Sequence, residues 1–271
     1  MRHHVLNMGE AQGQGYVGQA LGAADMLAAA STPTSCATGP TIRTGKVGTG
    51  SCCRTGHYAI GLYAALAEAG IIAVERARQP TDPTGPGCRC PGWPATHPGM
   101  EISGGSLGHG LTVAVGMALG LRHQGSSSRV FNFLSDGELD EGSTWEAAMS
   151  ASHHRLGNLT ALVDINALQA DGPTAGVLRI EPVTDKWAAC GWFVQRVDGN
   201  DVDALLAAFD DVAARRSLTG TPSVILCDTR IGCGVPLLEN REKAHFMRID
   251  ADEWQLCRDQ LTAGYTGSEQ A

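Results

Sequence analysis

The sequence lacks several features that would place the protein in a particular class. No run approaches about 18 consecutive apolar residues, so we predict no membrane-spanning helix. The start of the chain, Met1 to Gly15, lacks the basic-then-apolar layout of a secretory signal, and we expect a cytoplasmic protein. Basic residues are in deficit, with Lys+Arg 20 against Asp+Glu 28 and a net charge of -8. This deficit argues against nucleic acid or an anionic membrane as the main partner, so any bound phosphate must be held locally, by backbone N–H groups or a metal ion.

Aromatic residues are also scarce, at 5% of the chain, whereas hydrophobic residues make up 43%. Ala, Leu and Val therefore provide most of the apolar volume, and the 35 glycines indicate many tight loops. This composition is normal for a parallel-sheet protein. A length of 271 residues suits one large α/β domain or two small ones, and we predict a single domain over residues 1–271.

Cysteine, in contrast, is not scarce, since the chain has nine. Their spacing is irregular, and Cys88 and Cys90 form the close pair that suggests a zinc ligand set. A zinc site needs a second Cys or His pair at ligand spacing, and none follows. We therefore predict free thiols in a reducing compartment rather than a zinc site.

Two long segments are poor in apolar residues and are predicted to be loops. Residues 31–56 are rich in Ser, Thr and Gly, and residues 79–106 have Pro and Gly at many positions. Loops of this length are uncommon and often functional. Between them, Tyr58 to Gly70 has helical apolar spacing and ends in glycine, which predicts a helix.

Strands and helices alternate regularly after Gly110. The alternation predicts an α/β fold with a doubly wound, mostly parallel sheet. Ligands of such sheets bind at the carboxyl ends of the strands, which points to the turns after Leu134 and Asp164 and to the loop after Asp228. The predicted strands cover residues 130–134, 159–164, 192–197 and 223–227, and the predicted helices cover residues 111–123, 144–155 and 202–216.

Polar residues suited to a hard metal ion stand at two of these strand ends. Asp136 and Gly137 follow one strand, and Asn166 follows the next. A carboxylate, an amide oxygen and a backbone carbonyl are ligands that Mg²⁺ accepts, with phosphate oxygens completing an octahedron. Gly137 would let a diphosphate approach the backbone, next to a helix N-terminus. The alternative is a pair of ordinary βα turns with polar residues.

The residues around these turns resemble the thiamine-diphosphate signature. The similarity runs from SDGELDEG at 135–142 to VDINALQADG at 163–172. WEAAMSASHHRLGNL at 145–159 and the ending LQADG resemble the transketolase branch rather than the pyruvate-dehydrogenase-type branch. Weaker similarity continues at 18–27, 55–70, 105–110 and 229–245.

The match covers most of the chain and is to the N-terminal subunit of a split transketolase. It implies the thiamine-diphosphate-binding fold, the cofactors thiamine diphosphate and Mg²⁺, and an α2β2 assembly with a C-terminal transketolase-like subunit. In this family the Glu that activates the aminopyrimidine comes from that other half, so we expect this chain alone to bind the cofactor weakly or not at all.

The resemblance implies roles for the residues of the polar turns. Asp136, Asn166 and the backbone carbonyl of Leu168 would hold Mg²⁺, and Gly137 and Glu138 would belong to the cofactor-binding turn.

The glycine-rich segment before residue 110 would hold the other end of the cofactor. Gly105, Ser106 and Leu107 would be cofactor-binding, with Gly105 and Leu107 at the aminopyrimidine. The alternative is an ordinary glycine-rich beginning of a helix.

Three further residues would be catalytic by resemblance. His57 would line the substrate channel near the thiazolium, and His245 would play a similar part from a late loop. Glu141 would belong to an acidic relay between the two cofactor sites of the assembly. The alternatives are a capping or surface histidine for His57 and His245, and for Glu141 a glutamate stabilised by a helix N-terminus.

The sequence departs from the family at positions that normally touch the sugar. Tyr16 stands where the family has His in Gly-His-Pro-Gly, and Trp93 stands where it has His in Pro-Gly-His-Pro. Ser135 replaces the usual Gly before Asp136. Since imidazoles exchange protons near neutral pH and tyrosine does not, the substrate half of the site looks rebuilt.

We therefore expect a transketolase-type enzyme with an unusual donor or acceptor. The donor would be a ketose or ketose phosphate, and the acceptor could be held on a carrier protein in a specialised biosynthetic pathway. Two alternatives stay open: a subunit of a thiamine-dependent enzyme that decarboxylates 2-keto acids, and a non-catalytic regulatory subunit.

Overall fold

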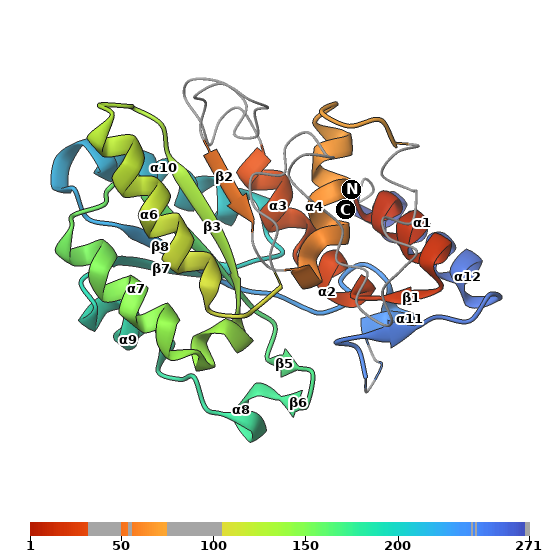
Figure 1. Cartoon of the computed structure of the whole chain (residues 1–271). Coiled ribbons are helices and arrows are strands. Elements are labelled where there is room, and N and C mark those ends of the chain that lie inside the picture. Colours follow the sequence, from red (N-terminus) through yellow and green to blue (C-terminus); the bar gives the residue numbers. More distant parts are fainter. Residues whose placement is uncertain (32–49, 54–55, 75–104, 240, 242, 269–271) are drawn as a thin grey trace.

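A five-stranded parallel sheet lies at the centre of the molecule, in the order β2-β3-β4-β8-β7 (Figure 1). The structure, a computed structural model, describes residues 1–31, 50–53, 56–74, 105–239, 241 and 243–268. Every neighbouring pair of strands in this sheet is parallel. The strands are β2 (Gly50–Cys53), β3 (Val130–Ser135), β4 (Leu159–Ile165), β7 (Phe193–Asp198) and β8 (Ser223–Asp228).

Helices cover both faces of this sheet (Figure 1). One face packs against α6 (His109–His123), α7 (Gly142–His153) and α9 (Val183–Ala189), with Trp187 fully buried among them. The other face packs against α3 (Ala24–Ser31) and α10 (Val202–Thr219). Because β3 and β4 are covered on both sides, all their residues are buried, which explains their mostly apolar sequences. The predicted doubly wound α/β fold is confirmed.

A second apolar cluster lies beyond the edge of the sheet and joins the two ends of the described chain. It packs α1 (Arg2–Gln12) and α2 (Val17–Gly22) against α4 (Ala59–Glu68) and α12 (Glu253–Ser268). At Gly9 in α1, an added Cβ would lie 2.9 Å from the ring of Trp254 in α12, so only glycine allows this approach. The remaining elements of this region are α11 (Pro236–Glu239) and the antiparallel pair β1 (Gln14–Gly15) and β9 (Met247–Arg248).

Short elements crowd the carboxyl ends of the strands. The 3-10 helix η3 (Asp136–Asp140) follows β3, and the hairpin of β5 (Leu168–Gln169) and β6 (Gly172–Pro173) follows β4. Helix α8 (Thr174–Val177) follows the hairpin, and the 3-10 helix η2 (Gly56–Tyr58) precedes α4.

Most of the predicted elements are present, with ends that differ by a few residues. The helix expected at 58–70 is α4, and the four predicted strands are β3, β4, β7 and β8. The loop expected at 31–56 is wrong at Gly50–Cys53, which forms strand β2 beside β3. This strand is short and lies at the sheet edge, where little apolar sequence is required. The rest of the loop at 31–56 lies mostly outside the described residues, as does 79–104.

The free thiols expected from the sequence are present where the structure describes them. Cys190, Cys227, Cys233 and Cys257 are unpaired, while Cys88 and Cys90 lie outside the described residues. In the part of the chain that is described, no three His, Cys, Asp or Glu side chains form a cluster that could hold a metal ion by themselves. The described helices also include none with the length and apolarity needed to cross a membrane.

Candidate functional site

The ends of β3, β4 and β8 meet at one place, as predicted. Ser135 pairs with Asp164 across β3 and β4, and Ile165 pairs with Asp228 across β4 and β8. The turns beyond these pairs touch as well, because the backbone N–H of Thr229 donates to the carbonyl of Ile165 over 3.1 Å. Parallel pairing thus brings together turns that are far apart in sequence.

Asp136 is buried at the centre of this meeting point. Its Oδ2 accepts from the backbone N–H of Ala167 at 2.9 Å and from the Thr174 hydroxyl at 3.1 Å. Its Oδ1 accepts from the N–H of Gly137 at 2.8 Å. Burial, and secondly the nearby Asp164 carboxylate, raises the pKa of Asp136 to about 7. Among the described residues, all the donors to this carboxyl are neutral, so a cation is what would favour its ionised form.

Asp164 is completely buried one residue before the end of β4. The hydroxyls of Tyr58 and Thr229 donate to its two oxygens, and Asn166 Nδ2 donates to Oδ2 at 2.9 Å. Burial raises the pKa of Asp164, while these three hydrogen bonds oppose the rise. Two buried carboxyls therefore lie close together, and their hydrogen-bond donors among the described residues are all neutral.

The loop from Asn166 to Leu168 offers the remaining oxygen ligands. Asn166 Oδ1 accepts from the N–H of Leu168 at 3.0 Å, and the Leu168 carbonyl lies 3.4 Å from Nδ1 of His245. Between them Ala167 has φ 61, a left-handed conformation that costs a non-glycine residue roughly 1–2 kcal/mol. Strain of this kind is retained where the backbone must follow a particular path.

This donor set fits Mg²⁺ with a bound diphosphate. One carboxylate, one amide oxygen and one carbonyl are hard ligands, and phosphate oxygens would complete the octahedron. Among the described residues, only neutral groups donate to the buried carboxyls of Asp136 and Asp164, so a divalent cation here would stabilise their ionised forms. Asp136, Asn166 and the Leu168 carbonyl therefore lie where the sequence predicts a metal site, and their role as ligands stays a prediction. Gly137 is sterically relaxed, because an added Cβ would approach Gln169 no closer than 3.5 Å.

The glycine-rich segment at 105–110 is tied to the same turn through Glu138. The two carboxylate oxygens of Glu138 accept from the backbone N–H groups of Ser135, at 3.1 Å, and Gly108, at 3.2 Å. Gly108 has φ 76, and an added Cβ would lie 2.4 Å from the hydroxyl of Ser143 and 2.6 Å from Cβ of Glu141. Glu138 thus joins two predicted cofactor-binding segments through their backbones.

The residues preceding Gly108 are open to solvent. Gly105, Ser106 and Leu107 are exposed, and Leu107 keeps 38% of its surface accessible. Glu141 is also exposed, at the N-terminal end of α7. The structure therefore places these four residues at a surface, and their predicted contacts with cofactor and acidic relay stay predictions.

The two predicted catalytic histidines come together with Tyr16. The ring centroids of His57 and His245 are 6.2 Å apart, and the Tyr16 ring lies 5.8 Å from the first and 5.6 Å from the second. Burial, and secondly His245, lowers the pKa of His57 to about 3, so its imidazole is neutral near pH 7. Burial also lowers the pKa of His245, whose Nδ1 is 2.8 Å from the amide nitrogen of Gln19.

A pocket of about 580 Å³ opens beside these rings. The Tyr16 and Phe246 rings meet edge to face on its wall, with centroids 5.0 Å apart. Tyr16 therefore lies in the region where the sequence predicts substrate contacts, whereas Trp93 is outside the described residues. The lining residues are Tyr16, Leu168 to Pro173, Lys243, His245 and Phe246.

A second cavity of about 730 Å³ lies on the other side of the Asn166–Leu168 loop. Asn166, Ala167 and Thr229 form one wall, and the charged residues of the cavity compensate one another, since Arg196 pairs with both Glu181 and Asp228 at 2.8 Å. Of the predicted metal ligands, Asn166 therefore lines this cavity, and Leu168 lines the pocket beside the histidines.

Sequence reasoning gave no role to Tyr58, Thr229 or Asp164, although all three form the centre of the polar cluster. A signal did exist for Asp164, because a carboxylate inside the otherwise apolar run LTALVD must be buried with partners. Tyr58 and Thr229 carry no comparable local signal, since their role depends on distant contacts.

Comparisons with known proteins identify the family. The sequence matches the family described as "Transketolase, thiamine diphosphate binding domain" over residues 2–269. A putative uncharacterized transketolase family protein of Sinorhizobium fredii is 50% identical over 98% of this chain and 94% of its own length. One of the subunits of the apulose-4-phosphate transketolase of Actinobacillus succinogenes is 37% identical over 76% of this chain and 73% of its own length.

The fold agrees with that of solved transketolases. The transketolase of Pichia stipitis superposes with a TM-score of 0.81 at 26% identity, over 96% of this chain and 39% of that chain. This chain thus spans well under half the length of that enzyme. Matched over nearly its whole length by one family description and by the fold of a solved member, the chain belongs to the transketolase family and corresponds to its thiamine-diphosphate-binding domain.

Proposed function

We propose that this chain is the cofactor-binding subunit of a two-component transketolase that transfers a two-carbon ketol unit from a ketose or ketose-phosphate donor to an acceptor. The observation that carries the proposal is the contact between the two polar turns, Asp136 to Ala167, beside the paired imidazoles of His57 and His245. A relative whose name describes it as one subunit of a transketolase supports a separate partner chain.

The polar turns would hold the cofactor's diphosphate through Mg²⁺. Asp136 and Asn166 would supply side-chain oxygens, and Leu168 would supply its carbonyl. When bound, thiamine diphosphate supplies the carbon nucleophile and electron sink for breaking and forming the C–C bond. We assign no residue of this chain to the activation of the aminopyrimidine, and the partner would provide that group.

The two histidines would handle the sugar hydroxyls. His57 is neutral near pH 7, and its buried Nε2 has no partner among the described residues. A neutral imidazole can donate a hydrogen bond from one nitrogen and accept with the other. His57 and His245 can therefore orient a hydroxyl from two sides, by accepting a hydrogen bond from it or donating one to it.

Tyr16 and Phe246 would narrow the substrate pocket with apolar surface. A tyrosine at pH 7 keeps its proton and carries a large apolar ring, unlike the histidine that the family usually has there. We propose on this basis that the donor or acceptor differs from ordinary pentose phosphates, with a carrier-bound acceptor as one possibility. We also propose that the metal is Mg²⁺, that the two subunits form an α2β2 assembly, and that the enzyme is cytoplasmic.

The test is capture of the partner from the native host, followed by assays of the reconstituted pair. A partner that raises the cofactor affinity of this chain and allows ketol transfer would support the proposal. Release of CO₂ from a 2-keto acid without ketol transfer would favour a decarboxylase, and an inert pair that still binds cofactor would favour a regulatory subunit. Full activity on ordinary pentose phosphates would keep the two-component assignment and reject the unusual substrate.

A further inference from the structure

We infer that Asp164 is a positioning residue: its buried carboxylate fixes the orientation of the Asn166 carboxamide, so that the amide oxygen is available to the metal. The inference rests on the proposed function, because it takes Asn166 as a ligand. It concerns a residue that would not touch the metal itself.

The direction of the Asn166 amide follows from what faces each of its ends. The amide nitrogen of Asn166 donates to Asp164 Oδ2 at 2.9 Å. The opposite end accepts from the N–H of Leu168 at 3.0 Å, which requires oxygen there. The two contacts agree, and the oxygen keeps a second lone pair for a cation.

Asp164 in turn is held by hydroxyl groups from two distant segments. Tyr58 in η2 and Thr229 after β8 donate to its two oxygens. The Tyr58 ring is buried against Phe133 of β3, with centroids 5.2 Å apart. The carboxylate therefore cannot rotate without breaking contacts to both segments.

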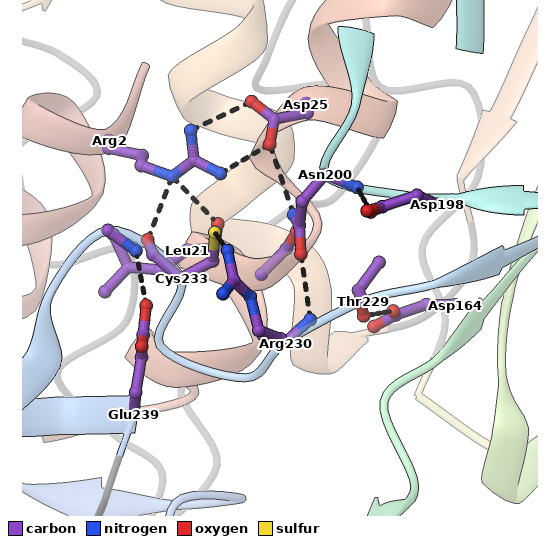
Figure 2. A network of polar contacts seen from close by, with 12 residues as sticks. Arg2, Leu21, Asp25, Asp164, Asp198, Asn200, Thr229, Arg230, Cys233 and Glu239 are labelled. Carbon is purple, nitrogen blue, oxygen red and sulfur yellow. Dashed lines mark hydrogen bonds and ion pairs between the residues drawn. The ribbon is translucent and has the colours of Figure 1, made fainter. Parts of the chain in front are cut away.

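The segment that carries Thr229 is itself anchored, as Figure 2 shows. The N–H of Arg230 donates to Asn200 Oδ1 at 2.9 Å, and Asn200 Nδ2 donates to Asp25 at 3.1 Å. The Arg2 guanidinium then donates two hydrogen bonds, of 2.8 and 2.6 Å, to the Asp25 carboxylate. A continuous polar network thus extends from the first helix to Asp164.

A purely structural role does not account well for a carboxylate here. Burying a carboxylate carries a desolvation penalty of several kcal/mol, which a neutral side chain of similar volume avoids. The same charge near an oxygen-ligand site favours a divalent cation and fixes the ligand's direction. Position and charge together favour a role toward the metal.

The test measures Mn²⁺ affinity by electron paramagnetic resonance, using the complex with the partner subunit and thiamine diphosphate. Asp164→Ala should weaken Mn²⁺ binding about 10–100-fold, as expected when the group orienting a ligand is lost. Asp164→Asn should weaken Mn²⁺ binding clearly less than Asp164→Ala, because its amide oxygen can still accept from Asn166 although the charge is lost. Asp210→Asn, on the exposed surface of α10, is the control for removing a carboxylate and should leave the affinity unchanged.

A double-mutant cycle separates positioning from general destabilisation. If Asp164 acts through Asn166, then Asp164→Ala should add little to the loss already caused by Asn166→Ala, whereas independent effects would add. Additive losses, or a folded Asp164→Ala protein with wild-type affinity, would overturn the inference. If Asn166→Ala itself leaves Mn²⁺ affinity unchanged, the metal-site assignment fails instead.

If Asp164→Ala does not fold, Thr229→Val tests the same inference by removing a hydroxyl that holds the Asp164 carboxylate. It removes one donor to Asp164 at nearly constant volume, and Thr229→Ser keeps the hydroxyl. We expect Mn²⁺ affinity to fall severalfold in the valine variant and to recover in the serine variant. Equal affinities in the two folded variants would contradict the inference.

Discussion

The backbone N–H of Ala167 donates to the Asp136 carboxylate over 2.9 Å, although the two residues belong to turns after different strands. This contact fixes the distance between the turns, and the left-handed φ of Ala167 lets the chain bend back to make it. The contact thereby holds the candidate metal ligands of the two turns close together.

Asp136→Asn should abolish most of the metal-dependent cofactor affinity. The amide keeps the shape and one acceptor but removes the negative charge, so we expect Mg²⁺-dependent binding to weaken at least about 100-fold, or roughly 2.8 kcal/mol. Calorimetry on the complex with the partner measures this. Asp140→Asn changes a carboxylate in the same turn and should alter binding much less, and equal losses in both variants would contradict the assignment.

Gly108→Ala should disturb the junction between the glycine-rich segment and Glu138. The new Cβ would meet the Ser143 hydroxyl at 2.4 Å, in addition to the cost of φ 76. Gly125→Ala isolates the backbone cost, since Gly125 has φ 67 and nothing within 4 Å of an added Cβ.

We expect Gly125→Ala to lose about 1–2 kcal/mol of unfolding free energy. The clash should cost Gly108→Ala roughly 1–3 kcal/mol more. Urea unfolding measures the free energies of both variants. Equal losses would mean that Ser143 and Glu141 move away from the new Cβ at little cost.

His57 should make the protein sensitive to mild acid. Its folded-state pKa of about 3 lies below the ordinary 6.5, so the unfolded chain takes up a proton that the folded protein does not. Stability therefore falls as the pH drops from 6.5 toward 3, by about 2 kcal/mol between pH 7 and 5. Among the described residues, the rings facing His57 are those of His245, Tyr16 and Tyr58, and none of them carries a carboxylate that would stabilise the His57 cation.

His57→Gln should remove this part of the acid sensitivity. Urea unfolding of the metal-free chain at several pH values measures the difference between wild type and variant. His153→Gln, on the exposed surface of α7, controls for the loss of an imidazole. A pH-independent difference between wild type and His57→Gln would show that burial does not keep the ring neutral.

Tyr16→His should shift substrate preference toward ordinary pentose phosphates. The substitution places an imidazole, which exchanges protons near neutral pH, beside His57 and His245. It also removes apolar surface from the pocket. We expect kcat/KM with a pentose phosphate donor to rise at least about tenfold, or roughly 1.4 kcal/mol of transition-state free energy. Tyr16→Phe keeps the ring and should not gain this activity. An unchanged preference in Tyr16→His would assign substrate selection elsewhere.

Arg2→Met should destabilise the chain far more than a surface arginine does. The Arg2 and Asp25 side chains are only 11% and 14% exposed, and breaking such a pair leaves a carboxylate with little solvent. We expect a loss of about 3 kcal/mol of unfolding free energy. Arg258→Met breaks the more exposed pair with Glu10 and should cost less than about 1 kcal/mol. Comparable losses of unfolding free energy in the two variants would mean that the Arg2–Asp25 pair stabilises the fold no more than the exposed Arg258–Glu10 pair does.

The sheet and its helices could be predicted because their signals are local. Strands β3 and β4 are mostly apolar runs that end in polar turns, and parallel pairing then places Asp136 near Asn166. Helix α1 was not predicted, and α2 was indicated only by the resemblance at 18–27, because glycines such as Gly9 and Gly18 weaken the local helix signal. Tertiary contact stabilises them instead, and an added Cβ at Gly18 would lie 2.8 Å from the Ala244 carbonyl.

The supporting side chains of the site could not be predicted in the same way. Tyr58 reaches Asp164 across 106 positions of sequence, and Thr229 reaches it across 65. Neither residue differs locally from an ordinary helix or loop residue. Their importance arises only when the fold brings three segments to one carboxylate.

The packing of α1 against α12 has a consequence for the order in which the chain can fold. Trp254 of α12 fills the space that Gly9 of α1 leaves open, so this cluster joins segments separated by most of the sequence. During synthesis, α1 emerges from the ribosome long before α12 exists. The sheet can assemble in the meantime, and α1 can pack against α2 and α4, but the part of α1 around Gly9 that faces Trp254 stays uncovered until α12 has been made. Contacts of such long sequence separation form slowly, and this interval is when the new chain is most exposed to chaperones and to aggregation.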